Sequence, residues 1–144
     1  MEDNIGAMLA DVSRLMRRSF DERARGIGVT RPQWQVLTVL GRHEGSKQAG
    51  VADLLDVEPI TLCRMVDRLQ EAELVERRRD PGDRRAWQLF LTPKARDLLE
   101  ELRPLGEEVM AIALDGFSQA ERDDLRQSLD RIRQNLARRT VGLA

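Results

Sequence analysis

Hydrophobic residues recur at helical spacing at both ends of the chain. Near the start they lie three and four positions apart, which predicts one face of a long amphipathic helix that ends before Gly26 and Gly28. After Thr92-Pro93 the same spacing returns in two further segments, the second of which opens with the capping pattern Ser118-Gln119-Ala120-Glu121. The apolar stripes of these three helices are Ile5, Met8, Leu9, Val12, Leu15, Met16 and Phe20; Leu98, Leu99, Leu102, Leu105, Val109, Met110 and Ala113; and Leu125, Leu129, Ile132 and Leu136.

Three shorter helices are predicted between these ends. Thr30-Arg31-Pro32-Gln33 is a capping box, so the second helix begins at Thr30, and residues 48–55 form a third helix. A tight connection at Asp56-Val57 leads to a fourth helix over residues 59–70, because Pro59 suits the first turn of a helix. The third and fourth helices with their short connection predict a helix-turn-helix.

Between residues 74 and 91 the spacing of apolar residues falls toward two, which predicts a β hairpin. Its strands, 74–79 and 85–91, flank Asp80-Pro81-Gly82-Asp83, whose Pro-Gly centre is typical of a type II turn. Trp87, Leu89 and Leu91 alternate on one face of the return strand and are expected to cover the helix-turn-helix. The predicted fold class is therefore mainly α with a small β-hairpin wing.

Composition narrows the class of protein. The 144 residues, 41% hydrophobic and 34% charged, suit one domain. No apolar run approaches the ~18 residues that span a bilayer, and the acidic start differs from a signal peptide, so we expect a cytoplasmic protein with no membrane partner. A single cysteine, Cys63, and a single histidine, His43, exclude an internal disulfide and the usual structural zinc site. We expect no cofactor.

The formal net charge of −1 conceals an uneven distribution of charge. Five arginines lie between residues 77 and 85 beside two aspartates, whereas ten acidic residues face three arginines between Asp97 and Asp130. A basic hairpin next to an acidic body concentrates positive potential where a polyanion can dock. Judged by charge alone, the arginines of the hairpin could also be an ordinary run of solvated surface charges.

The three long helices carry more apolar surface than the small central region can cover. Two copies that pack these helices together would bury the stripes and place two hairpins side by side about a twofold axis. A monomeric bundle is the alternative interpretation.

Three stretches of the chain carry a resemblance to a known family. They are Val57-Glu58-Pro59-Ile60-Thr61-Leu62-Cys63-Arg64-Met65-Val66-Asp67-Arg68-Leu69, Leu74-Val75-Glu76-Arg77 and Asp80-Pro81-Gly82-Asp83-Arg84-Arg85-Ala86. They resemble the MarR family, the multiple-antibiotic-resistance regulators, and within it the SlyA-like branch. The resemblance implies a single MarR-like domain over residues 1–144. In it, residues 30–92 form the winged helix-turn-helix DNA-binding region, and residues 1–28 and 94–144 form a helical dimerisation region.

The same resemblance implies the partners. A homodimer would bind a palindromic operator in double-stranded DNA, usually as a repressor and sometimes as an activator, and a small aromatic or phenolic effector often releases it. The sequence departs from the family where Ile60 and Cys63 replace small polar residues and where Asp56 replaces the usual turn glycine. Aspartate still adopts a left-handed backbone, so we expect the fold to persist while the preferred base sequence differs.

The outer face of the fourth helix carries the candidates for reading DNA sequence. We expect Thr61 and Arg64 to meet base edges in the major groove, with Arg64 bidentate on a guanine. Ile60 would contact a thymine methyl group. Arg68, one turn further along, is expected at a phosphate, with an ion pair to Asp67 or Glu71 as the alternative.

The hairpin carries the second set of candidates. Arg84 and Arg85 are placed to enter a narrow minor groove, and Asp83 would hold one guanidinium through a charge-assisted pair. Arginines 77–79, including the candidate site residues Arg77 and Arg79, would flank phosphates unless one of them is tied to Glu73 or Glu76.

Two further groups of residues have a functional and a structural interpretation. Thr30 and Gln48 head the second and third helices, whose first amides can bind phosphate, although both residues would also act as caps. Val12, Met16 and Trp34 would line an effector crevice or belong to a packed core, and we favour the core for Trp34.

Other functions are less well supported by the residues. One histidine, one cysteine and no tyrosine leave few ways to build a catalytic site, so we expect no enzymatic activity. Oxidation of Cys63 on the DNA-facing side would block binding, but a lone cysteine without a resolving partner is usually incidental. The remaining alternative is a winged-helix module that binds another protein and not DNA.

Overall fold

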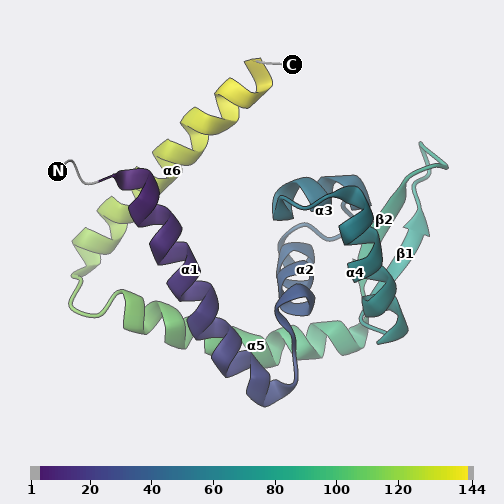
Figure 1. Cartoon of the computed structure of the whole chain (residues 1–144), viewed down its shortest axis with the longest axis horizontal. Helices are drawn as coiled ribbons and strands as arrows, with labels where there is room; N and C mark the ends of the chain where they lie inside the picture. The colour runs from purple at the N-terminus through teal and green to yellow at the C-terminus, as the bar shows by residue number, and fades with distance from the viewer. Residues whose placement is uncertain (1–3, 143–144) are drawn as a thin grey trace. The chain divides into compact units, whose positions relative to one another are not determined.

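A computed structural model describes residues 4–142 of the chain, with side chains up to residue 138. The chain divides into two compact units, one up to Val109 and one from Met110 onward. In the described residues, no helix is long and apolar enough to cross a membrane. The elements, shown in Figure 1, are α1 (Ile5–Ala24), the short helix η1 (Arg25–Ile27), α2 (Arg31–Arg42), α3 (Gln48–Leu55), α4 (Pro59–Glu71), β1 (Val75–Arg79), β2 (Trp87–Leu91), α5 (Pro93–Ala113) and α6 (Gln119–Gly142).

The predicted capping boxes are confirmed at the starts of two helices. At α2, the Thr30 N–H donates to Gln33 Oε1 at 3.0 Å. At α6, the Ser118 N–H donates to Glu121 Oε1 at 3.0 Å, and the Glu121 N–H donates to Ser118 Oγ at 3.1 Å. Each box satisfies amides that have no partner within the helix, which fixes where the helix begins.

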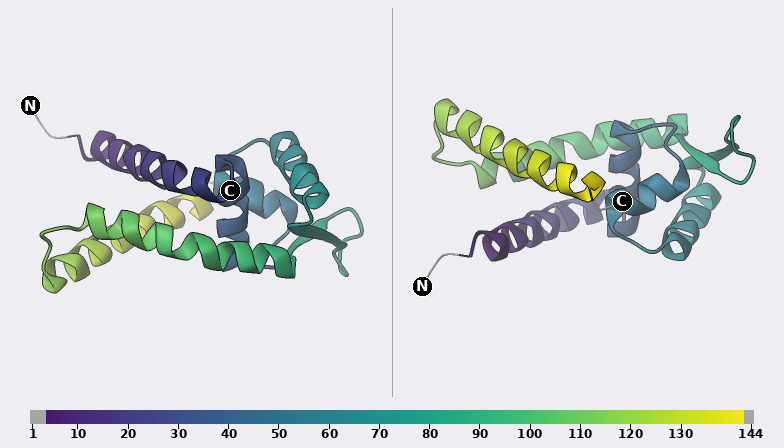
Figure 2. Two further views of the ribbon diagram at one scale, coloured as in Figure 1. Left: turned by 90° about the horizontal axis from the view of Figure 1, so that it is seen from below. Right: turned by 90° about the horizontal axis from the view of Figure 1, so that it is seen from above.

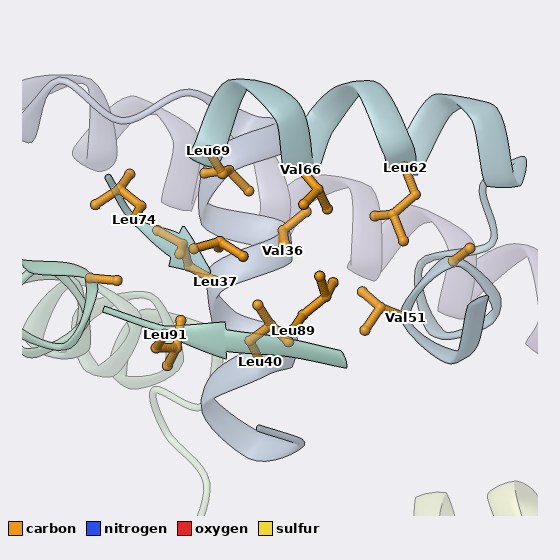
Figure 3. Close-up of a cluster of buried hydrophobic side chains, with 13 residues drawn as sticks. Val36, Leu37, Leu40, Val51, Leu62, Val66, Leu69, Leu74, Leu89 and Leu91 are labelled. Atoms are coloured by element: carbon orange, nitrogen blue, oxygen red, sulfur yellow. The ribbon is translucent and has the colours of Figure 1, made fainter. Parts of the chain in front are cut away.

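The first unit is built around one hydrophobic core. Its helix α4 turns a stripe of Leu62, Val66 and Leu69, spaced three and four residues apart, inward toward α2 and β2 (Figure 3). Burial of each such side chain contributes about 1.5–3 kcal/mol, so this stripe fixes which face of α4 remains outside. The largest fully buried side chains of the core are Val36, Leu37, Leu40, Val51, Leu62, Val66, Leu69, Val75 and Leu89.

A second, smaller cluster joins the end of α1 to α2 and α5. Ala24, Val29 and Leu102 are buried in it, and Phe20 and Trp34 pack against them. The rings of Phe20 and Trp34 meet edge to face, with their centroids 4.7 Å apart. Trp34 is therefore a core residue, as expected from the sequence.

The hairpin of β1 and β2 is antiparallel, and Arg77 lies opposite Leu89 in its register. The loop between α2 and α3 adds a short third segment to β2. There the Gly45 N–H donates to the Leu89 carbonyl at 2.9 Å, and the Leu89 N–H donates to the Ser46 carbonyl at 3.0 Å. This segment was not predicted, because it is too short to show a spacing of two.

The predicted type II turn at the hairpin tip is wrong. A type II turn requires a positive φ at Gly82, which Gly82 does not have. Instead the buried Asp80 carboxylate accepts the N–H groups of Gly82 at 2.8 Å and Asp83 at 3.1 Å. The Asp80 N–H donates to the Ala86 carbonyl at 3.1 Å, so the loop is longer than predicted and β2 begins two residues later, at Trp87.

The turn of the helix-turn-helix has the predicted backbone conformation. Asp56 ends α3 in the left-handed region, with φ of 53°, where the family usually has a glycine. Aspartate tolerates this region better than most residues, so α4 can start within a few residues of α3.

Candidate nucleic-acid interface

The outer face of α4 is exposed and open to a partner. Because the buried stripe occupies one side of the helix, Ile60, Thr61, Arg64 and Arg68 lie on the other, and Ile60 is 60% exposed. Exposed β-branched and aliphatic groups at the start of a helix have no role in the core, so this face is a candidate contact surface.

The two arginines on this face are unpaired. Within residues 4–138, neither Arg64 nor Arg68 forms an ion pair or a side-chain hydrogen bond. The ion pair considered for Arg68 is absent, since Asp67 pairs with Arg77 at 2.6 Å instead. Both guanidinium groups therefore keep all their donors for an external acceptor.

The tip of the hairpin carries a second pair of unpaired arginines. The side chains of Arg84 and Arg85 are exposed and have no hydrogen-bond partner among the described residues. The expectation that Asp83 holds one of these guanidinium groups is not met. The Asp83 carboxylate accepts the backbone N–H of Arg85 at 3.0 Å, because the loop folds back at this point.

The strand arginines next to the tip rest on aromatic rings. Arg78 stacks over Phe90 with 4.1 Å from its guanidinium carbon to the ring centroid, and Arg79 stacks over Trp87 at 3.9 Å. Arg78 also hydrogen-bonds Glu76, as one alternative foresaw, and this contact lowers the pKa of the Glu76 carboxyl. The Arg79 Nη1 donates to a backbone carbonyl of the tip at 2.8 Å. These contacts hold the hairpin, while both stacked guanidiniums keep part of their edge in solvent.

Arg77 does not lie where a phosphate-flanking arginine would. Its side chain is only 13% exposed, and every guanidinium nitrogen donates to a protein acceptor. Nε donates to Gln48 Oε1 at 3.1 Å, Nη1 to Asp67 Oδ1 at 2.6 Å and Gln70 Oε1 at 3.0 Å, and Nη2 to the Cys63 carbonyl at 3.0 Å. The prediction for Arg77 is corrected: its side chain joins elements of the protein.

Gln48 also has a different place from the one expected. Lys47 is the N-cap of α3, so Gln48 is the first residue inside the helix and does not cap it. Its side chain accepts the hydrogen bond from Arg77. Thr30, by contrast, does cap α2.

The three candidate effector residues differ in their surroundings. Val12 is exposed on α1 and Met16 is half-buried on the same helix. Trp34 packs in the smaller cluster and donates from Nε1 to Asp21 at 2.7 Å. Packing within the described unit accounts for Trp34 without a ligand.

Asp67 and Gln70 were not predicted as partners of the wing, although the sequence carries a signal for them. Counting by two from the buried Val75 places Arg77 on the inner face of β1. An arginine on an inner face needs acceptors, and Asp67 and Gln70 lie three residues apart on one side of α4. Asp80 carried a local signal as well, because an aspartate at the first position of a turn commonly accepts N–H groups two and three residues later.

Taken together, the helix-turn-helix and the two-stranded wing define the first unit as a winged helix-turn-helix. Unpaired arginines lie on two of its elements, α4 and the wing. In both views of Figure 2 the wing projects from the end of this unit opposite to the start of α1.

Comparisons with known proteins identify the family. Residues 27–86 match the MarR family. The fold matches a MarR transcriptional regulator from Methanosarcina mazei Go1, with 25% identity, a TM-score of 0.84, and coverage of 93% of this chain and 96% of that one. The transcriptional regulator PA3341 is 34% identical, with a TM-score of 0.84 and coverage of 94% and 99%. The transcriptional regulator SlyA, 22% identical over 94% and 96% of the two chains, shares the fold with a TM-score of 0.81.

The chain belongs to the MarR family of winged helix-turn-helix transcriptional regulators. Members of this family are regulators and not enzymes.

Proposed function

We propose that the protein is a sequence-specific regulator that binds double-stranded DNA as a homodimer at a palindromic operator and represses transcription. One observation supports this above the others. Among the residues that the structure describes, the side chains of Arg64 and Arg68 on α4 and of Arg84 and Arg85 on the wing have no partner, although other arginines close to them in the sequence do. Unpaired arginines on these two elements suit a polyanionic ligand with two adjacent grooves.

Each element has its own role in this proposal. Thr61 and Arg64 read base edges in the major groove, with Ile60 against a thymine methyl group, and Arg68 binds a phosphate. At the wing, Arg84 and Arg85 enter the minor groove, where narrow A·T-rich segments attract arginine. The remaining contacts are to phosphates, by the exposed edge of Arg79, by the first amide of α3 at Gln48, and by the hydroxyl of Thr30, whose own N–H is already bonded to Gln33.

The homodimer is supported by apolar side chains that are exposed in the single chain. They form a stripe on α1 and another on α6: Ile5, Met8, Leu9, Val12 and Leu15, and Leu125, Leu129, Ile132 and Leu136. Such contiguous patches on both terminal regions are typical of an interface between subunits. We therefore assign dimerisation to residues 1–28 and 94–144, and DNA binding to residues 30–92.

Three finer parts of the proposal rest on the resemblance alone. They are membership of the SlyA-like branch, a working location in the cytoplasm, and release from DNA by a small aromatic or phenolic ligand near Val12, Met16 and Trp34.

Selection of bound duplexes from a random pool, followed by a salt titration, tests the proposal. We expect one palindromic sequence to be enriched, and the logarithm of its affinity to fall steeply and linearly with the logarithm of salt concentration, because phosphate contacts release counterions. A duplex with a scrambled half-site is the control. If no duplex binds at low salt, the wing serves a protein partner and the rival function, a winged-helix interaction module, is correct.

A further inference from the structure

We infer that Arg77 is a positioning residue for DNA recognition, which fixes the wing against α4 so that both DNA-binding elements are presented in one arrangement. The inference rests on the proposed function and adds a residue that does not itself touch DNA. It replaces the role that the sequence pattern predicted for Arg77.

The contacts of Arg77 join three elements of the helix-turn-helix unit. From β1 its guanidinium reaches Gln48 at the start of α3 and Asp67, Gln70 and the Cys63 carbonyl on α4, all within 3.1 Å. A planar guanidinium can serve acceptors in several directions at once, whereas a lysine ammonium is a single point of charge on a flexible stem. The arrangement thus depends on the shape of arginine as well as on its charge.

The acceptors are next to the residues proposed to read DNA. Cys63 precedes Arg64 and Asp67 precedes Arg68 on α4, so each end of the contact lies beside an unpaired arginine. On the wing side, Arg79 follows two residues later on the same strand and donates to the Arg84 carbonyl at 2.8 Å. Two contacts in series along β1, at Arg77 and at Arg79, therefore connect α4 to the wing tip through the backbone of this strand.

Such a series lowers the cost of binding. A wing that is already ordered against α4 loses little conformational freedom when its tip enters a groove, so more of the contact energy appears as affinity. Without Arg77 the wing would move relative to α4, and contacts at the tip would be made at a larger entropic cost.

Substitutions of opposite charge separate positioning from electrostatics. Arg77→Met removes a positive charge and Asp67→Ala removes a negative one, so an effect of charge alone weakens DNA binding in the first variant and strengthens it in the second. If Arg77 positions the wing, both variants bind the selected operator about tenfold more weakly, because both break the same contact. Arg77→Lys is expected to restore only part of the affinity.

Glu76→Ala is the matched control. Glu76 is the acidic partner of Arg78 on the outer face of β1, so this variant also removes one carboxylate from an arginine of the same strand but leaves α4 untouched. Its affinity for the operator should stay equal to or slightly above that of the unmodified protein.

A second measurement needs no DNA. In a Trp34→Phe background, Trp87 is the only tryptophan of the chain and lies on the wing. Its nanosecond fluorescence anisotropy should decay faster in Arg77→Met and Asp67→Ala than in the parent or in Glu76→Ala, since only the first two release the wing. A fold that is merely less stable would not change this decay in the folded protein.

The outcomes are distinct. The inference is overturned if Asp67→Ala strengthens operator binding as Glu76→Ala does, or if Trp87 is equally ordered in all variants. If Arg77→Met does not fold, Asp67→Ala and Gln70→Ala carry the same comparison, because both side chains are exposed on α4. If the parent protein binds no duplex, the proposed function fails while the anisotropy still decides whether Arg77 holds the wing.

Discussion

At the scale of single residues, the arginines of β1 show how strand geometry divides one residue type among different roles. Side chains alternate between the two faces of a strand, so Arg77 faces inward to acceptors on α4 while Arg78 faces outward to Glu76. On α4 the helical repeat does the same, because it turns Arg64 and Arg68 away from the buried stripe. Availability for DNA therefore depends on the face that a residue occupies more than on its identity.

Arg64→Ala tests the assignment of base reading to α4. Loss of a bidentate contact to a guanine should cost about 1 to 3 kcal/mol of binding free energy and relax the base preference at one position of each half-site. Arg68→Ala should instead weaken binding to all duplexes alike and reduce the salt dependence, since a phosphate contact carries no sequence information. Fluorescence anisotropy titrations against operators with single base changes measure both effects.

Arg103→Ala provides the control for this comparison. Arg103 is an exposed arginine of α5 that pairs with Glu100, so its loss changes net charge equally without touching α4 or the wing. Equal losses of affinity in Arg64→Ala and Arg103→Ala, with unchanged base preference, would remove Arg64 from the reading face.

Individual side-chain partners were the least predictable feature of the site. Trp34 was correctly expected in the core. Val29 and Trp34 lie on either side of the capping box at Thr30, in the positions of a hydrophobic staple, and this motif can be recognised from local sequence. The prediction failed for Arg77 and Asp83, whose partners are set by how the hairpin folds onto α3 and α4 and by the loop at the tip. A long guanidinium can reach several acceptors, and only the packed arrangement decides among them.

At the scale of elements, the backbone at the end of α4 is strained at Glu73, and a substitution can relieve this strain. The Leu74 N–H donates to the Leu69 carbonyl at 2.9 Å, which closes the helix with a Schellman motif, and Glu73 occupies its left-handed position with φ of 61°. A left-handed conformation costs roughly 1 kcal/mol for a residue with a Cβ and little for glycine. Glu73→Gly should therefore raise the free energy of unfolding by about 0.5 to 1 kcal/mol, as measured by urea denaturation.

The same substitution two residues earlier should have the opposite sign. Glu71 lies in the last turn of α4 with an ordinary helical backbone, so Glu71→Gly should lower the free energy of unfolding by about 0.5 to 1 kcal/mol. If both glycine variants destabilise the protein, the left-handed position does not limit stability.

A polar contact between α1 and α2 gives the protein a predictable pH dependence. Burial raises the pKa of Asp21. Hydrogen bonds from Arg31 Nε at 2.6 Å and from Trp34 Nε1 at 2.7 Å, together with the positive charge of Arg31, lower it by more. The pKa of Asp21 therefore lies below its ordinary value of 3.8. A carboxyl with a lowered pKa stabilises the fold above pH 3.8, and this contribution is lost as the pH falls through its pKa in the folded protein.

Asp21→Asn tests this dependence, because the amide can still accept from Trp34 but carries no charge for Arg31. Near pH 7 the variant should be less stable by roughly 1 kcal/mol, and the difference from the parent should shrink as the pH is lowered below the ordinary carboxyl range. Urea denaturation at several pH values measures the difference. A constant difference down to pH 2 would show that ionisation of Asp21 does not contribute.

Elements were more predictable than contacts, for reasons visible in particular residues. Helix starts are encoded locally by pairs such as Thr30 with Gln33 and Ser118 with Glu121, and each was confirmed. The hairpin turn was mispredicted because the Asp80 carboxylate competes with the Pro-Gly preference by binding two loop amides. This preference of aspartate is also local, so the misprediction came from giving the Pro-Gly pair more weight than the aspartate before it.

At the scale of the whole molecule, the exposed apolar stripes and the location of the charges both support DNA binding by a dimer. A single recognition unit presents few arginines, and a net charge of −1 gives no general attraction to DNA. Two units on one dimer would engage two half-sites about one DNA turn apart, and the second contact would then be intramolecular. Affinity for a palindrome should therefore depend on the terminal helices even though they do not read bases.

Leu129→Glu tests this dependence, because Leu129 lies within the apolar stripe of α6 with Leu125 and Ile132 four and three residues away. A carboxylate buried in a subunit interface without a partner is strongly unfavourable, so light scattering at micromolar concentration should give a monomer mass. Operator affinity should fall by a factor on the order of 100, since each half-site is then bound alone. Gln127→Glu adds the same charge two residues away, on the opposite side of the helix from the stripe, and should keep both dimer and affinity. A Leu129→Glu protein that is dimeric and binds as tightly as the Gln127→Glu control would show that α6 does not hold the subunits together. A monomer with unchanged operator affinity would show that DNA binding does not depend on dimerisation.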